Sequence, residues 1–147
     1  MYSLLILLHV LGACIWTGGH LVLAFTIMPK ALVSKDLTLL QGFEQAYERI
    51  GIPALLLQIV TGLSLLWMLS PDMSLWFSAG NPVSHLLWIK LGLLLLTALF
   101  AVDARFRVIP NLSPANLIDL AWHVYPVTIL SVLFVGAGVM HRFGWWA

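Results

Sequence analysis

The chain carries five histidines, and the spacing of four of them places these side chains on shared helix faces. His9 and His20 are eleven residues apart. In an α-helix that leaves them about 20° apart around the axis and roughly 16 Å apart along it. His123 and His141 are eighteen residues apart, almost a whole number of turns, so they share a face roughly 27 Å apart. Such a pattern could hold a metal or a redox cofactor at two depths.

The composition shows what kind of element must position these side chains. Of 147 residues, 61% are hydrophobic and 9% are charged, with a mean hydropathy of +1.00. So few charges cannot cover a water-facing surface, so the solvent is mostly the lipid bilayer. A net charge of +1 excludes the basic field that nucleic-acid binding needs. Cys14 is the single cysteine, which excludes a disulfide within the chain and a CxxC motif.

Four apolar stretches are each long enough to cross a bilayer, which takes roughly 20 residues. The sequence therefore predicts an all-α, integral membrane four-helix bundle that forms one domain over residues 1–147. The predicted helices cover about 2–28, 50–70, 83–102 and 116–140. Between the first two, Leu40, Phe43 and Tyr47 recur at helical spacing among charged residues, which predicts a short helix in the membrane interface.

The basic residues predict the orientation of these helices. The first and third links contain five lysines and arginines, whereas the second link, 71–82, contains none. Cytoplasmic links carry an excess of lysine and arginine, so we expect the first and third links inside and both termini outside (N-out/C-out). The five basic residues are Lys30, Lys35, Arg49, Arg105 and Arg107.

With this orientation the ionisable residues form two groups, which are functional candidates because charge inside a span is costly. His20 and His123 form the inner pair, and two histidines on facing helices at one depth can supply both axial ligands of a haem. His9 is the best outer ligand, and its partner is open among Lys90, His141 and His85. Arg49 and Arg105 at the cytoplasmic edge could pair with haem propionates.

The leading hypothesis is therefore a redox protein that binds one or two haem b groups and transfers electrons. Its donor would be a membrane quinol, with a membrane or periplasmic redox partner, and the sequence leaves open whether it is an oxidoreductase or a homo-oligomer. Copper handling is the alternative, because soft ligands for copper gather near the predicted outer face. These are Met68, Met73, His85, Met140 and His141.

Three stretches resemble a known superfamily over most of the chain. LHVLGACIWTGG (8–19) resembles the L-H-x₆-W-x-x-G start of CopD-type (copper resistance D) membrane proteins and of HemJ-type protoporphyrinogen oxidases. ERIGIPALLLQIVTGL (48–63) is similar to their second helix, and WIKLGLLLLTALF (88–100) followed by RFRVIPNL (105–112) is similar to their third helix and its basic link.

This resemblance implies a helical membrane fold and two activities. The HemJ-type group implies haem b, protoporphyrinogen oxidation, and His9 and Lys90 as functional positions. The CopD type implies copper handling at the inner membrane of a Gram-negative bacterium, and hence a multi-pass protein of the bacterial inner membrane.

Overall fold

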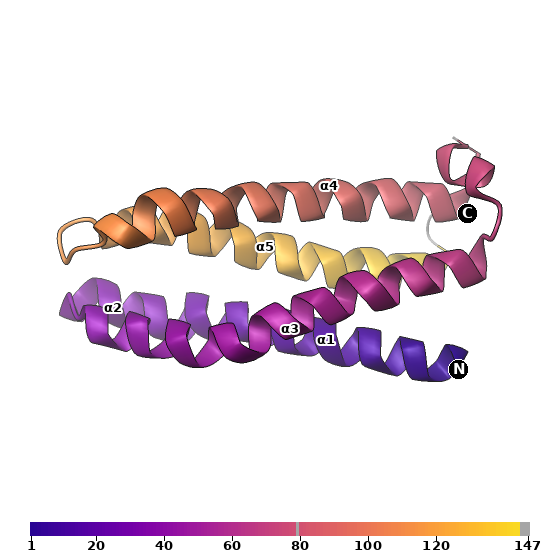
Figure 1. Ribbon diagram of the computed structural model, residues 1–147. Helices are drawn as coiled ribbons and strands as arrows, with labels where there is room; N and C mark the ends of the chain where they lie inside the picture. Colours follow the sequence, from indigo (N-terminus) through magenta and orange to yellow (C-terminus); the bar gives the residue numbers. More distant parts are fainter. Residues whose placement is uncertain (79, 145–147) are drawn as a thin grey trace.

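The computed structural model describes residues 1–78 and 80–144. Within these residues the regular structure is entirely helical, and four long helical segments dominate it (Figure 1). The elements in chain order are α1 (Tyr2–Val22), the π-helical turn η1 (Leu23–Ile27), α2 (Met28–Ser34), α3 (Leu37–Leu69), the 3₁₀ turn η2 (Met73–Phe77), α4 (Pro82–Asp103), the π-helical turn η3 (Ala104–Val108), the 3₁₀ turn η4 (Ile109–Asn111) and α5 (Leu117–Arg142).

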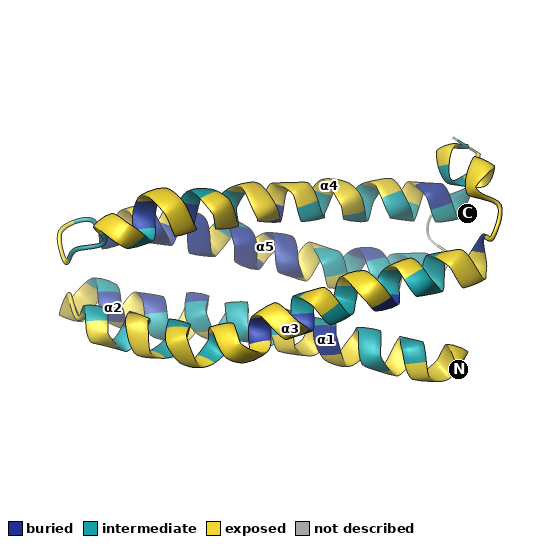
Figure 2. Ribbon diagram, viewed as in Figure 1, coloured by how far each residue is buried: buried dark blue, intermediate teal, exposed yellow. Residues whose placement is uncertain are grey.

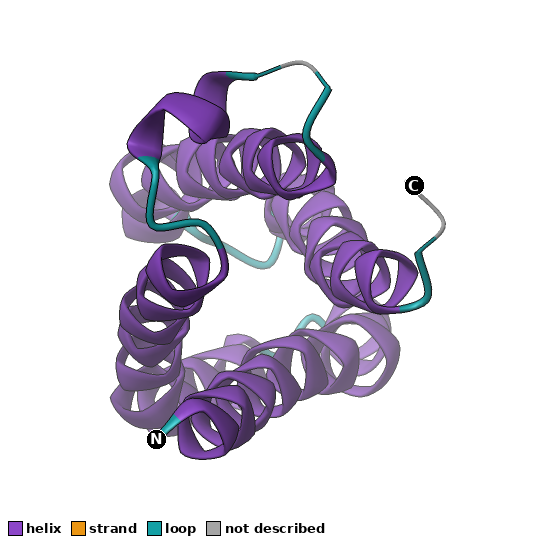
Figure 3. Ribbon diagram, turned by 90° about the vertical axis from the view of Figure 1, so that its right-hand side faces the viewer, coloured by secondary structure: helices purple, strands orange, loops and turns teal. Residues whose placement is uncertain are grey.

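The four segments run antiparallel, so the bundle has two distinct ends (Figure 1). We name the end that holds Tyr2, η2 and Arg142 the terminal end. The opposite end, with the turn at 35–36 and the connection 112–116, is the loop end. Viewed along the bundle, the helices surround a common axis (Figure 3). The main packing pairs are α1 with α3 and α4 with α5, and α1 also packs on α5.

All four segments are long and apolar enough to cross a membrane: Tyr2–Ser34, Leu37–Leu69, Pro82–Asn111 and Leu117–Arg142. Their outward faces carry exposed apolar side chains (Figure 2), as expected where the surrounding solvent is lipid. The predicted all-helical membrane fold is confirmed for the described residues. The N-out/C-out orientation stays a prediction.

The first helical segment runs past residue 28, where it was predicted to end, and continues through Pro29. Pro29 lacks the N–H that would bond to residue 25, and its ring crowds that carbonyl. The π-helical turn η1 directly before it widens the helix at this point, and the chain then continues helically to Ser34. The same device precedes Pro110, where η3 extends the third segment beyond α4. Pro29 therefore lies inside the first segment, whereas Pro110 lies in η4, the last turn of the third segment.

The predicted interfacial helix is not a separate element, because its residues form the first part of the continuous helix α3. Leu40 is buried in the core of the bundle. The hydroxyl of Tyr47 donates to the backbone carbonyls of Ile15 and Trp16 on α1, at 3.1 and 3.0 Å. The amphipathic pattern that suggested a membrane surface is thus used for packing between helices.

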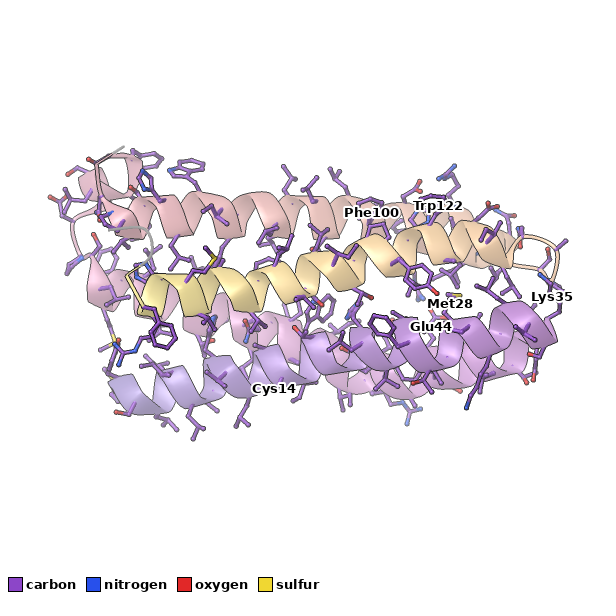
Figure 4. All side chains as sticks on the ribbon, turned by 180° about the vertical axis from the view of Figure 1, so that it is seen from behind. Cys14, Met28, Lys35, Glu44, Phe100 and Trp122 are labelled. Carbon is purple, nitrogen blue, oxygen red and sulfur yellow. The ribbon has the colours of Figure 1, made fainter. Side chains whose placement is uncertain are left out.

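The best-packed part of the bundle lies at the loop end (Figure 2). Met28 and Leu117 are fully buried there, and Figure 4 shows Met28 in the same half of the bundle as Lys35, which lies at the tip of the turn. The core cluster consists of Ala24, Met28, Ala31, Leu40, Val108, Leu117, Leu120, Ala121 and Val124.

An aspartate caps the start of α3 beside this core. The Asp36 carboxylate accepts hydrogen bonds from the Thr38 hydroxyl at 2.6 Å and from the Thr38 backbone N–H at 2.8 Å. These bonds stabilise the charged form and lower the pKa of Asp36 below its ordinary value of 3.8. The cap satisfies one of the free N–H groups at the helix start.

Candidate functional site

The loop half holds a polar cluster centred on His123, a buried residue of α5. Its Nε2 lies 2.6 Å from Oδ2 of Asp103, and its Nδ1 lies 2.7 Å from the carbonyl oxygen of Asp119. The guanidinium of Arg107 donates to the same Asp103 carboxylate through Nε and Nη2, at 2.7 and 2.5 Å. Both ring nitrogens of His123 are therefore already engaged by oxygen atoms of the protein.

His20 lies in a different environment on α1. Its Nδ1 donates to the carbonyl of Trp16 at 2.9 Å, and its ring packs on the Trp16 ring at 4.5 Å and edge-on to Tyr47 at 6.0 Å. Its backbone carbonyl accepts from the hydroxyl of Thr128 at 3.2 Å. Thr128 is five residues beyond His123 on α5, a rise of about 7.5 Å.

The two histidines of the predicted inner pair therefore have separate sets of protein contacts in the described structure. His20 packs against Trp16 and Tyr47, whereas His123 is held by Asp103 and Asp119. A haem ligated by His20 and His123 thus finds no support in this arrangement.

The arginines proposed for haem propionates have protein partners or lie at the surface. Arg105 forms ion pairs with Glu44 at 3.3 Å and Glu48 at 3.7 Å, which tie η3 to the first turns of α3. Arg49 is exposed. The pairs of Arg105 are solvent-exposed and contribute little to stability.

The terminal half holds the second polar site, and His9 is its centre. The Nδ1 of His9 lies 2.8 Å from Oγ1 of Thr61, which is buried on α3. The single hydroxyl proton of Thr61 is donated to the carbonyl of Leu57 at 2.6 Å. Thr61 must then accept from His9, so the proton of the neutral imidazole sits on Nδ1 and Nε2 keeps its lone pair.

Two further contacts fix the position of His9. Gln58 of α3 donates from its side-chain amide to the backbone carbonyl of His9. Gly62 lies against the ring, because a methyl group at this position would come 3.2 Å from Cε1 of His9. The sequence analysis did not select Gln58 or Thr61, although both are polar residues inside an apolar span.

Lys90 completes this layer from α4. Its ammonium is close enough to the His9 imidazole for their charges to interact. A methyl group at Gly138 of α5 would lie 3.7 Å from Nζ of Lys90, so the lysine spans the interior toward α5. Of the three predicted outer partners of His9, Lys90 is the one that interacts with it electrostatically in the described structure. His141 is one turn beyond Gly138, and His85 is exposed near the start of α4.

The soft metal ligands are distributed unevenly between the two ends. Met68, Met73, Met140 and His141 belong to the last turns of α3 and α5 or to η2, which all lie at the terminal end (Figure 1). Met28 is sealed in the core of the loop half. Among the described residues, no three His, Cys, Asp or Glu side chains form a preassembled metal cluster. A metal at the terminal end would therefore use thioether groups together with imidazoles.

The fold and these sites define the class of the protein: a multi-pass helical membrane protein with a histidine–lysine layer in its core. The family model of Copper resistance protein D (CopD) matches residues 41–141, and the chain belongs to this family. The CopD-type resemblance predicted from the sequence is thereby confirmed. No curated protein and no solved structure matches the chain.

Proposed function

We propose that this protein takes part in copper resistance by binding copper ions at the terminal end and passing them into the membrane-spanning core. Membership of the CopD family is the observation that carries this proposal. The concentration of thioether and imidazole groups at one end supports it, because these are ligands that copper favours among biological metals.

His9 is the residue we propose as the first ligand inside the membrane. Its Nδ1 proton is held by Thr61, so Nε2 presents a lone pair in the form that a metal requires. Metal-binding histidines are commonly oriented in this way by a hydrogen bond at the other ring nitrogen. His141, one turn nearer the terminal end on α5, would connect this ligand with the methionines outside.

Lys90 affects how tightly the proposed site would hold copper. A cation bound to His9 would be repelled by the nearby ammonium, and the repulsion is strong where water is scarce. Lys90 therefore favours release of copper over retention. This property suits a protein that moves the ion rather than storing it.

The arrangement of charge supports a direction of entry. The basic residues of the first and third links lie in the loop half, whereas the soft ligands lie at the terminal end. If the loop end faces the cytoplasm, as the positive-inside rule predicts, copper meets the protein from outside the cell membrane. We propose a location in the bacterial inner membrane, because the CopD-type resemblance implies it.

The decisive experiment compares copper accumulation and copper tolerance in cells that lack the protein and in cells that express the full chain. We expect both quantities to change when the protein is removed and to be restored by the wild-type chain. His9→Gln should fail to restore them. Unchanged accumulation in cells lacking the protein would refute the proposal.

The methionines provide a matched control for this experiment. A triple variant, Met68→Leu with Met73→Leu and Met140→Leu, removes the soft ligands of the terminal end with little change in volume. Met28→Leu makes the same exchange in the packed core of the loop half, where volume-conserving changes cost less than about 1.5 kcal/mol. We expect the triple variant to lose copper handling and Met28→Leu to retain it.

Haem-dependent redox chemistry is the second candidate, and the closeness of His9 and Lys90 favours it. The HemJ-type resemblance implies these two residues as functional positions, and the free Nε2 of His9 could ligate haem iron. Bound haem b would supply one-electron chemistry, with a membrane quinol as donor. Visible spectra of oxidised and reduced protein from haem-replete cells test this candidate. A colourless preparation rejects it, whereas a b-type band that His9→Gln removes supports it.

A further inference from the structure

Two concave regions meet on the loop half of α5. The first is a polar pocket of about 330 Å³, within the size range of small-ligand sites, and it opens to the surface. The second is a groove of about 340 Å³ along the outer face of α5, lined by apolar and aromatic residues. The pocket is lined by Arg107, Val108, Asn111, Asn116, Asp119, Trp122 and His123. The groove is lined by Ile118, Ala121, Trp122, Tyr125, Pro126 and Ile129.

Trp122 joins the two regions because it lines both of them. It lies on the loop half of α5 (Figure 4), and 71% of the residue is exposed. An indole is an amphipathic group that suits the boundary between headgroups and acyl chains. From Ile118 to Ile129 the groove covers about 16 Å of helix, which is enough to hold a substantial length of one acyl chain.

The charges in the pocket are balanced. Arg107 and Asp119 both line it and interact electrostatically. Part of the Arg107 charge is already offset by its bonds to Asp103. An anionic ligand would meet the Asp119 carboxylate, and a simple cation would meet the guanidinium. A ligand that carries a phosphate and an ammonium group next to each other matches both.

We propose that this double concavity is a binding site for a phospholipid with a zwitterionic ethanolamine headgroup. The phosphate lies beside Arg107 and the α5 N-terminus, and the ammonium donates to Asp119. One acyl chain occupies the groove between Ile118 and Ile129. An ethanolamine headgroup is favoured over choline because a trimethylated nitrogen has no N–H to donate to the carboxylate.

The proposal is tested on delipidated full-length protein in detergent by native mass spectrometry. The protein is titrated with phosphatidylethanolamine, phosphatidylcholine and phosphatidylglycerol that carry identical acyl chains. We expect one phosphatidylethanolamine to bind about tenfold more tightly than the other two lipids, as the loss of one charge-assisted hydrogen bond implies. Equal retention of the three lipids would show ordinary lipid contact with the helix and would overturn the proposal.

Three variants locate the site. Asp119→Asn should abolish the preference for ethanolamine over choline, and it should bind phosphatidylglycerol more tightly than the wild type does, because the carboxylate that repels an anionic headgroup is gone. Trp122→Ala should weaken all three lipids, because it removes the wall that the pocket and groove share. Phe106→Ala is the matched control, since Phe106 is an equally exposed aromatic residue (77%) that lines neither region. An unchanged preference in Asp119→Asn would refute the assignment of the headgroup.

A soluble competitor separates the lipid from a free headgroup. Glycerophosphoethanolamine has the same charges without acyl chains. We expect it to displace the lipid poorly, since most of the apolar contact is with the groove. Displacement at comparable concentrations would show that the pocket alone binds the ligand and would overturn the role of the groove. Neither Asp119→Asn nor Trp122→Ala touches the His9 layer, so copper handling should remain intact in both.

Discussion

Replacing Thr61 by valine tests whether His9 is prepared as a metal ligand. The exchange keeps the shape of the side chain and removes the hydroxyl that lies 2.8 Å from His9 Nδ1. Thr61 is 2% exposed, so water does not take over the lost role. Without an acceptor at Nδ1, the tautomer with its proton on Nδ1 loses the hydrogen bond that favours it, and the proton distributes between the two ring nitrogens. The tautomer with a free Nε2 is then no longer favoured.

The magnitude follows from the strength of one buried hydrogen bond between membrane helices. Such bonds contribute about 0.6 kcal/mol on average and up to about 1.7 kcal/mol. If this free energy sets the tautomer ratio, the affinity for copper falls by about 3-fold to 20-fold. Loss of an outer-shell partner in other metal sites reduces affinity by about 10-fold to 100-fold, so we expect roughly tenfold.

The assay is a competition for copper(I) between the purified protein in detergent and a chromogenic chelator. Thr61→Ser is the matched control, because it retains the hydroxyl and should bind as the wild type does. Thr61→Val should bind roughly tenfold more weakly, with a melting temperature that falls only slightly. Equal affinities of Thr61→Val and wild type would refute the reasoning, because the hydrogen bond would then have no part in metal binding.

Three further predictions concern other parts of the bundle. Gly19→Ala should destabilise the protein by about 1–3 kcal/mol, since a methyl group there overlaps the Tyr47 ring; in a Tyr47→Ala background the cost should vanish, and additive unfolding free energies would contradict this. Thr38→Val should raise the pKa of Asp36 toward its ordinary value of 3.8, because the hydrogen bond from the Thr38 hydroxyl lowers it; an NMR titration measures this shift. In the wild type, the stabilisation by the charged cap is complete above pH 3.8 and is lost as the pH falls through the lowered pKa. Lys90→Leu should strengthen copper binding in the chelator assay by removing a nearby cation, and an unchanged affinity would show that the ammonium does not face the bound ion.

The four membrane-spanning helices could be predicted because the requirement that the membrane imposes, hydrogen bonding of the backbone, is met within each segment. Every backbone polar group in lipid must be paired within its own segment, so a long apolar stretch already implies a helix. The helix ends were harder to predict. The first helix was predicted to end at about residue 28, but the π turn before Pro29 accommodates the proline ring, and no local pattern signals such a turn.

The predicted interfacial helix shows a second limit of prediction from the sequence. Leu40 and Tyr47 recur at the spacing of an amphipathic helix, and that pattern is the same whether the apolar face meets lipid or another helix. Here Leu40 enters the core and Tyr47 bonds to α1. Only the three-dimensional arrangement separates the two cases.

The candidate site could be predicted only in part, because a sequence pattern does not show what a helix face contacts. Helical periodicity predicts which residues share a face of one helix, but it does not show which neighbours they meet. His123 was selected as a haem ligand, yet Asp103 of α4 occupies its Nε2. His9 and Lys90 were both selected, and the structure places them in one layer, whereas Thr61, which orients His9, carries no periodic signal.

The two halves of the bundle divide stability from function. Large apolar residues such as Met28, Leu117 and Leu120 are buried in the loop half, where the Asp103 cluster also lies. In the terminal half, buried positions are small or polar, as at Gly12 and Thr61. A region with little buried apolar surface opens at a low free-energy cost, and an ion can enter and leave such a region. We therefore expect the terminal half to open more readily than the loop half, as the proposed entry of copper at that end requires.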